Sequence, residues 1–262
     1  MKIIILTDGN NKIGMGHVYR SLNLSIILKN DGHDIIFLTN EESTKKIISN
    51  SNECKFIKNI SQIQLKKYLR KISPDIIIID KLNETKNNLE TLKKNGPIIG
   101  IDYTGKHKEL FDYGINILYP KSGISTKSFS GLNYAILNTK FKNIKKKKIM
   151  KKVKSVLILQ GGADTHCFTP KIIKAVNGLN GDFKISIVLG PSFKCWLKLN
   201  ETLKIVEKQI KVYHNVKDMA NLMQKHDFAI TAAGNTLLEL AHLGIPSAMI
   251  CAEKFEVETS RS

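Results

Sequence analysis

The sequence predicts an α/β protein made of two Rossmann-like, doubly wound domains, and three observations predict it. Short apolar runs alternate with amphipathic segments, as buried parallel strands alternate with the helices that cover them. The alternation stops at a lysine-rich stretch, residues 143–154, and then begins again. Glycine-containing turns follow several of the runs, where open parallel sheets form their ligand sites. The 262 residues are enough for two such domains.

Each expected element follows from its apolar spacing. The strands expected in the first half are residues 2–7, 34–38, 75–80 and 97–102, with helices over 17–30, 42–50, 61–71 and 84–95. The strands expected in the second half are residues 155–162, 184–190, 209–214, 228–231 and 246–251, with helices from Pro170 and over 196–207, 216–225 and 235–243. Thr169 and Pro170 together predict a helix start, a capping hydroxyl followed by proline at the first helical position.

These elements predict an N-terminal domain over residues 1–142, a linker over 143–154 and a C-terminal domain over 155–262. Two such domains are expected to face each other across a cleft, with ligands at the carboxyl ends of their strands.

Composition excludes several classes of protein. No uncharged apolar stretch approaches the roughly 18 residues of a membrane span. The first apolar run ends at Leu6, too early for a signal peptide, so a cytoplasmic protein without a transmembrane segment is expected. The four cysteines are scattered and form no C-x-x-C pair, so we expect free thiols rather than disulfides or a zinc site: Cys54, Cys167, Cys195 and Cys251.

The formal net charge of +18 raises the question of nucleic-acid binding. Only three of the 41 basic residues are arginine, the side chain that base and phosphate recognition favours. The lysines lie on the outer faces of amphipathic patterns or in residues 143–154. We therefore interpret the charge as compositional bias and expect no specific nucleic-acid partner, while a general attraction for anionic ligands stays compatible.

The first glycine loop, "IGMGHVYR", carries the first candidate site. Gly14, Met15 and Gly16 bring the backbone close to a ligand at a helix start, and His17 and Arg20 follow on that helix. Tyr19 breaks the G-x-G-x-x-G pattern, so no nicotinamide cofactor is expected. Asp8, at the end of the first strand, and Arg20 are expected to belong to the substrate site, and Asp8 is expected to accept a hydrogen bond from the His17 ring.

The second half carries further glycine loops. Gly161 and Gly162 follow its first strand, and Gly190 ends its second. In "TAAGNTLLEL", Ala233 and Gly234 remove bulk at a helix start, where Asn235 and Thr236 are expected to cap the helix. Free amides there would suit a diphosphate without a metal ion. Glu239, one turn later, would reach ribose hydroxyls.

These motifs, in this order and with "GLNYAILNTKF", "IVLGP" and "MANLMQKHDFAI", resemble the UDP-sugar hydrolases of the pseudaminic acid pathway and their spore-coat polysaccharide relatives. A more distant resemblance is to the glycosyltransferase that makes lipid II. The resemblance implies the glycosyltransferase-B architecture and hydrolysis of UDP-2,4-diacetamido-2,4,6-trideoxy-β-L-altrose to free sugar and UDP, in the biosynthesis of nonulosonic acids.

The resemblance also implies roles for residues. His17 would be the catalytic base that activates water. Uracil would lie against the loop of Gly190 and the backbone near Asn215 and Val216, and Glu239 would hold the ribose. Neither a cofactor nor a metal ion is implied, and a monomer is expected.

Three departures from the family pattern leave the reaction open. Leu82 stands where the family often has a tyrosine, and Lys254–Phe255 stands where many members have asparagine followed by a glutamine that usually faces the sugar. The chain also stops soon after its last strand, so a shortened C-terminal end is expected. A UDP-sugar glycosyltransferase on the same fold and a non-catalytic nucleotide-sugar-binding module stay as alternatives.

Overall fold

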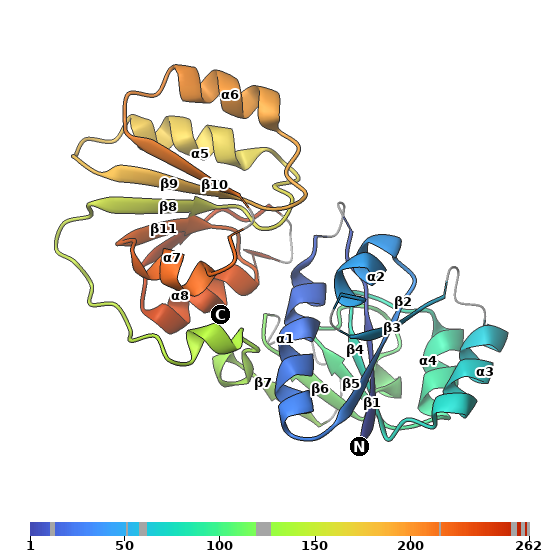
Figure 1. The fold of residues 1–262 in the computed structure, drawn as a ribbon. Helices are drawn as coiled ribbons and strands as arrows, with labels where there is room; N and C mark the ends of the chain where they lie inside the picture. The colour runs from blue at the N-terminus through green and yellow to red at the C-terminus, as the bar shows by residue number, and fades with distance from the viewer. Residues whose placement is uncertain are drawn as a thin grey trace. The chain divides into compact units, whose positions relative to one another are not determined.

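The structure, a computed structural model, describes residues 1–10, 14–50, 52–57, 62–118, 127–214, 216–252, 256–257 and 260. The chain divides into two compact units, Met1–Ile136 and Leu137–Ser262. Each unit is a parallel β-sheet with helices packed against it (Figure 1). The predicted fold class, two Rossmann-like α/β domains, is confirmed.

The first unit contains a seven-stranded sheet in the order β3-β2-β1-β4-β5-β6-β7. Every pair of neighbouring strands is parallel. Its strands are β1 (Lys2–Thr7), β2 (Asp34–Thr39), β3 (Glu53–Phe56), β4 (Ile76–Asp80), β5 (Ile98–Ile101), β6 (Tyr113–Asn116) and β7 (Ser128–Ser130). Its helices are α1 (Gly16–Asn30), α2 (Glu42–Ile48), α3 (Gln62–Ile72) and α4 (Lys86–Lys93), with 3₁₀ turns η1 (Lys108–Leu110) and η2 (Leu132–Tyr134).

The second unit contains a five-stranded parallel sheet in the order β10-β9-β8-β11-β12. Its strands are β8 (Ser155–Leu159), β9 (Lys184–Leu189), β10 (Ile210–His214), β11 (Phe228–Thr231) and β12 (Ser247–Met249). Its helices are α5 (Phe168–Asn177), α6 (Trp196–Lys204), α7 (Met219–Gln224) and α8 (Asn235–Leu243), and the 3₁₀ turn η3 (Thr139–Phe141) precedes β8.

The central strands are the ones that the apolar runs predict. Ile4, Leu6, Ile77 and Ile79 of β1 and β4 are fully buried or nearly so, within one core cluster. A strand covered on both faces needs apolar side chains at successive positions, and these strands have them. In the second unit, β8 and β9 form the corresponding core with α5 and α6.

Three strands, β3, β6 and β7, are not predicted from the sequence. The first and last are the edges of the sheet. β3 alternates exposed with half-buried residues, and β7 is exposed throughout. Such strands lack the continuous apolar run that marks a buried strand.

The second unit begins at Leu137, a few residues before the end of the N-terminal domain that the sequence predicts. Phe141 explains the difference, because its buried ring packs in the core of the second unit with Leu157, Leu240 and Leu243. No helix in the described ranges is long and apolar enough to cross a membrane.

Candidate functional site

Three neighbouring strands of the first sheet each end in a carboxylate. Asp8 follows β1, Asp80 is the last residue of β4, and Asp102 follows β5. Because the strands are parallel, all three side chains belong to the carboxyl edge of the sheet, where α1 also begins at Gly16. Ligands of open α/β sheets bind at this edge.

His17 lies in the first turn of α1 and pairs with Asp80. Its Nδ1 is 2.7 Å from Asp80 Oδ1, and its side chain is 12% exposed. Burial opposes ionisation of Asp80, but the charge of Arg20 and the hydrogen bond from His17 lower the pKa of Asp80 to about 2. The carboxylate is therefore ionised and can only accept, so Nδ1 donates a hydrogen bond to it and Nε2 is the ring nitrogen left for a ligand.

Arg20, which the sequence analysis places in the substrate site, is instead buried beneath it. Its Nε is 3.0 Å from Asp80 Oδ2 and its Nη2 is 2.6 Å from Asp80 Oδ1, while Nη1 donates to Asp102. Ser21 Oγ also donates to Asp80 Oδ2, at 3.0 Å. Burial disfavours the charge of Arg20, but the two carboxylates raise its pKa, so the guanidinium stays charged. Arg20 therefore binds the Asp80 carboxylate that also pairs with His17, and a contact between Arg20 and substrate stays a prediction.

Asp8 is not the partner of His17, which corrects a second expectation. It forms an ion pair with Lys81, and its Oδ1 accepts hydrogen bonds from Thr39 Oγ1 at 2.7 Å and from Asn40 N at 3.2 Å. Lys81 is bound on its other side by Glu84, at 3.0 Å. Asp8 is therefore buried and satisfied within its own cluster, which leaves the imidazole to Asp80.

The glycine loop has the role in backbone geometry that its sequence predicts. Gly14 has a φ of 79°, a left-handed conformation that favours glycine, and its N–H donates to Asn10 O at 2.9 Å. Gly16 is exposed at the helix start. Met15 is buried, so its side chain fills the core and only its backbone faces the loop.

Asp80 and Asp102 are not among the site residues that the sequence predicts. One signal could have identified Asp80: His17, Arg20 and Ser21 have the i, i+3, i+4 spacing of one helix face. A polar stripe on a helix that must cover a buried sheet needs polar partners on that sheet. The runs "DIIIID" and "PIIGID" both end in the carboxylates that provide them.

In the second unit, Glu239 lies in the middle of α8, the helix that begins just after the carboxyl end of β11. Burial raises the pKa of its carboxyl to about 7. No ion pair or hydrogen bond of this carboxyl occurs within the part of the chain that the structure describes. A desolvated, unpartnered carboxylate is costly, which makes it a candidate for binding a ligand that donates hydrogen bonds.

The start of α8 differs in one detail from the prediction. Its N-cap is Gly234, without a side-chain cap, so Asn235 and Thr236 are first-turn residues rather than caps. Ala233 is buried behind the turn. A Cβ on Gly234 would meet nothing within 4 Å, and its φ of −112° suits any residue. Nothing in the described surroundings therefore requires glycine here, and the free space suits a ligand.

The other two glycine loops of the second unit pack against each other. A Cβ on Gly190 would come within 2.3 Å of Gly162 O, and Ser192 N donates to that oxygen at 2.9 Å. Gly161 has a φ of 68°, which again favours glycine. The local backbone thus explains why glycine is present at positions 161 and 190, whereas it does not explain Gly234.

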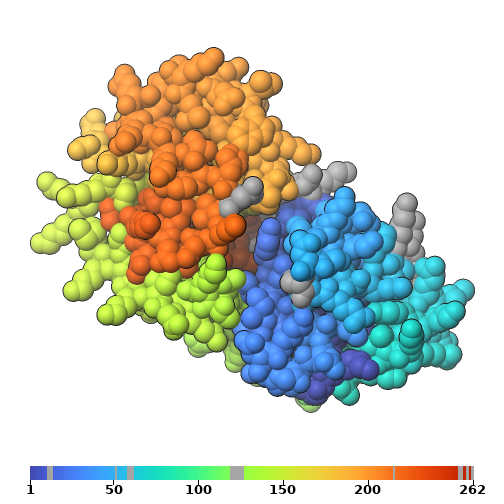
Figure 2. Space-filling model, viewed as in Figure 1, coloured from blue at the N-terminus to red at the C-terminus, as the bar shows by residue number. Residues whose placement is uncertain are grey.

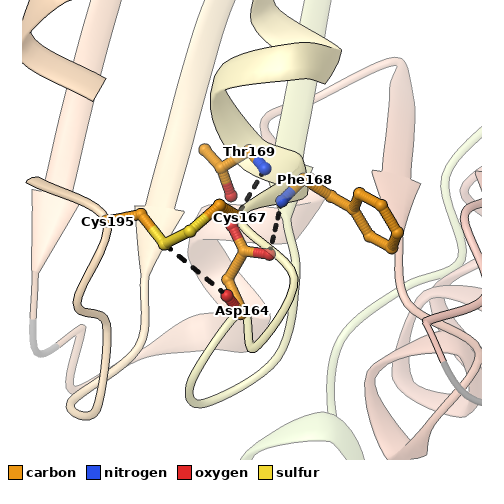
Figure 3. The surroundings of a disulfide bond; sticks show 5 residues. All are labelled: Asp164, Cys167, Phe168, Thr169 and Cys195. Carbon is orange, nitrogen blue, oxygen red and sulfur yellow. Dashed lines mark hydrogen bonds between the residues drawn. A yellow bond between two sulfur atoms is a disulfide. The ribbon is translucent and has the colours of Figure 1, made fainter. Parts of the chain in front are cut away.

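A disulfide joins the same two loops, so the expectation of four free thiols is wrong. It links Cys167 and Cys195, the N-cap residues of α5 and α6 (Figure 3). The predicted start of α5 at Thr169–Pro170 also needs correction. The helix starts at Phe168, and the Asp164 carboxylate caps it by accepting from Phe168 N at 2.7 Å and Thr169 N at 2.9 Å.

We expect this disulfide to stabilise the second unit. Replacing both Cys167 and Cys195 with serine should lower the free energy of unfolding by about 2–4 kcal/mol, because the bond closes a long loop of the unfolded chain. Urea denaturation measures the change. Serine at Cys54 and Cys251, the two cysteines outside the bond, is the control. Equal midpoints for the two double variants, or four alkylatable thiols in the unreduced protein, would contradict the assignment.

The other predicted site residues lie before α7, after β4 or outside the described residues. Val216 is half-buried in the turn before α7, and Asn215 and Lys254–Phe255 lie outside the described residues. Leu82 is half-buried, and its carbonyl accepts from Thr104. No group of three or more histidine, cysteine or acidic residues that could hold a metal occurs in the described ranges, and metal independence stays a prediction.

No protein-family model matches the chain. The chain is 34% identical to the uncharacterized protein MJ1062 of Methanocaldococcus jannaschii, over 98% of this chain and 57% of that protein, so it spans little more than half of this relative. It is 25% identical to the spore coat polysaccharide biosynthesis protein SpsG of Bacillus subtilis, over 100% of this chain and 80% of that protein.

Solved structures show the same fold at low identity. The MurG structure from Acinetobacter baumannii has a TM-score of 0.73 at 12% identity, covering 99% of this chain and 82% of that one. The calicheamicin glycosyltransferase CalG4 has a TM-score of 0.57 at 12% identity, covering 100% and 82%. Anabaena HepE in complex with UDP and glucose has a TM-score of 0.57 at 12% identity, covering 95% and 80%. The chain therefore has the glycosyltransferase-B fold.

Proposed function

We propose that the protein hydrolyses a UDP-activated diacetamido-trideoxyhexose to the free sugar and UDP. The observation that carries the proposal is the His17–Asp80 pair, which keeps the Nδ1 proton in a hydrogen bond and leaves Nε2 as a base. The spore-coat polysaccharide relative supports a role in carbohydrate biosynthesis. The HepE structure, in which the same fold holds UDP and glucose, supports a sugar nucleotide as substrate.

The proposed step uses one residue of the first unit for proton transfer. Water attacks the anomeric carbon, its proton moves to His17 Nε2, and the bond from that carbon to the UDP oxygen breaks with its electron pair on UDP. Asp80 stabilises the imidazolium that forms, because the carboxylate is already ionised and remains so. Backbone N–H groups at the start of α8 would stabilise the charge on the leaving diphosphate.

The test is incubation with UDP-activated diacetamido-trideoxyhexoses in the absence of any acceptor. UDP and free sugar should appear in equal amounts. Binding of UDP without turnover at any enzyme concentration would instead indicate a non-catalytic nucleotide-sugar-binding module.

Glycosyl transfer is the second candidate function, and the fold shared with CalG4 favours it. The chemistry at His17 would be the same, with an acceptor hydroxyl in place of water. UDP release that depends on an added acceptor, with no free sugar formed, would favour transfer over hydrolysis.

Gly234 provides a test of the UDP site that is separate from stability. Gly234→Ala should leave the melting temperature unchanged, since its methyl group has space, but should lower UDP affinity by about tenfold or more by occupying ligand space. Gly190→Ala, in contrast, should lower the free energy of unfolding by about 1–3 kcal/mol, because its methyl group would clash with Gly162. Calorimetry with UDP and thermal melts measure both. Full UDP affinity in the Gly234 variant would place the diphosphate elsewhere.

The raised pKa of Glu239 predicts that nucleoside binding depends on pH. Ribose hydroxyls donate to the ionised carboxylate, so affinity for uridine should fall by up to about tenfold per pH unit as pH drops below about 7. Uridine is the better probe than UDP, whose phosphate also titrates there. Glu239→Gln should bind uridine weakly at every pH.

The same substitution should raise stability. The pKa of Glu239 is raised in the folded protein, so the carboxyl disfavours folding increasingly as pH rises from its ordinary value of 4.5 to about 7; the effect is complete above about pH 7 and absent below 4.5. Glu239→Gln should therefore be more stable than wild type by roughly 1–3 kcal/mol above pH 7 and equal to it in acid. A Gln variant with unchanged, pH-dependent uridine affinity would remove Glu239 from the site.

A further inference from the structure

The lysine-rich segment before β8 contains a loop, residues 148–153, that a single carboxylate holds at both ends. Asp227 Oδ1 is 3.0 Å from Lys147 Nζ, and Asp227 Oδ2 accepts from Lys154 N at 2.9 Å. Lys147 N also donates to Leu243 O at 2.7 Å, which anchors the segment to the end of α8. Between these anchors, residues 148–153 make no hydrogen bond or ion pair with any described residue.

The loop exposes apolar and basic side chains together. Ile149, Met150 and Val153 are 76%, 50% and 40% exposed. They alternate with the exposed lysines Lys148, Lys151 and Lys152. Residues 143–154 contain no acidic side chain, and Lys145, Lys146 and Lys154 add to the charge at the base of the loop. Figure 2 shows this yellow-green part of the chain at the outer surface of the second unit.

We propose that this loop docks the second unit on a lipid bilayer with anionic headgroups. Lysine ammonium groups are point charges that are attracted to a negative surface without a directional fit. Exposed aliphatic side chains between them can enter the boundary between headgroups and acyl chains, which removes their apolar surface from water.

The composition of the loop distinguishes a membrane from a nucleic acid. Residues 142–154 contain no arginine to read phosphates or bases in a bidentate way and no aromatic ring to stack on bases. Ile149 and Met150, the most exposed apolar side chains of the loop, would have no role on a phosphate backbone. The interpretation of the charge as pure compositional bias does not explain why these two stand in water.

Docking here is compatible with ligand binding by the same unit. Lys154 directly precedes β8 and Asp227 directly precedes β11, so the loop belongs to the amino edge of the sheet. The glycine loops and the start of α8 belong to the carboxyl edge. The inference is independent of the proposed reaction, because it uses none of the residues assigned to it.

The test is sedimentation of the full chain with phosphatidylcholine vesicles, with and without phosphatidylglycerol. Wild type should bind only the anionic vesicles and should be released by salt. Two triple variants should each reduce the partition coefficient by about tenfold or more: Lys148→Gln with Lys151→Gln and Lys152→Gln, and Ile149→Ser with Met150→Ser and Val153→Ser.

The matched control removes the same charge from another exposed surface, with Lys66→Gln, Lys67→Gln and Lys71→Gln on α3. It should bind vesicles as wild type does. The inference is overturned if wild type does not bind anionic vesicles, or if the α3 variant loses as much binding as the loop variants. It is also overturned if the loop variants keep vesicle binding and lose binding of polyuridylate, which would make the loop a nucleic-acid surface. Circular dichroism confirms that all variants are folded.

Discussion

Replacing His17 with alanine is expected to lower turnover of the UDP-sugar by about 10²–10⁴-fold, the usual scale for the loss of a general base. The imidazole is the one side chain of the Asp80 cluster that is partly exposed, since Asp80 and Arg20 are buried beneath it. Its Nε2 has no partner among the described residues, so the alanine variant loses the proton acceptor and little packing. UDP affinity should change little, because the proposed UDP site lies in the second unit. Steady-state kinetics and calorimetry with UDP separate the two quantities.

Two further variants make this expectation specific. His17→Asn should not restore turnover, since an amide can orient water but cannot take its proton. His33→Ala, beyond the other end of α1, is the matched control and should have wild-type turnover. Near-normal turnover of the His17 variants would indicate that His17 is a structural residue and not the base. Loss of folding together with UDP binding would also indicate a structural role.

The sequence predicts the fold well where burial imposes a strong pattern. The isoleucine runs of β1 and β4 are buried on both faces, and their residue ranges match the predicted ones closely. The edge strand β3 is exposed at alternate residues and β7 at every residue, so neither has the apolar run of a buried strand. The lysine-rich segment, residues 143–154, likewise has no apolar run, because none of its residues is as deeply buried as Phe141, which lies before it.

The site is predictable only in part, for a reason of topology. A glycine loop before a helix marks the place of His17 from local sequence alone. The hydrogen-bond partner of His17 cannot be predicted in this way, because Asp8 and Asp80 both stand at the ends of buried strands and no local sequence feature distinguishes them. The choice depends on β4 lying beside β1 and on the face of α1 that carries Arg20 and Ser21 inward. Likewise, the Cys167–Cys195 bond follows from two helix starts at neighbouring strands rather than from any spacing.

Asp80→Asn is expected to lower turnover by about 10²–10⁴-fold although His17 itself is unchanged. The ionised carboxylate fixes the proton on Nδ1 and stabilises the imidazolium, whereas an amide can donate to Nδ1 and select the other tautomer. The substitution also removes one of the two charges that neutralise Arg20, so a loss of stability of about 1–3 kcal/mol should accompany it. Stability alone therefore cannot establish the role of Asp80.

Asp102→Asn is the matched control that separates positioning from stability. Asp102 pairs with the same guanidinium from the neighbouring strand, but the carboxylate that hydrogen-bonds the imidazole is Asp80. Both variants should unfold at a lower urea concentration than wild type. In the absence of urea, where both variants are folded, only Asp80→Asn should lose turnover.

The pH dependence of stability gives a second readout. The pKa of Asp80 is lowered to about 2, so wild type has its full contribution above the ordinary value of 3.8 and loses it as pH falls through about 2. Asp80→Asn should lack this acid-dependent part of the stability curve. Equal losses of turnover in the two variants would mean that Asp80 only neutralises Arg20, and that another group orients His17.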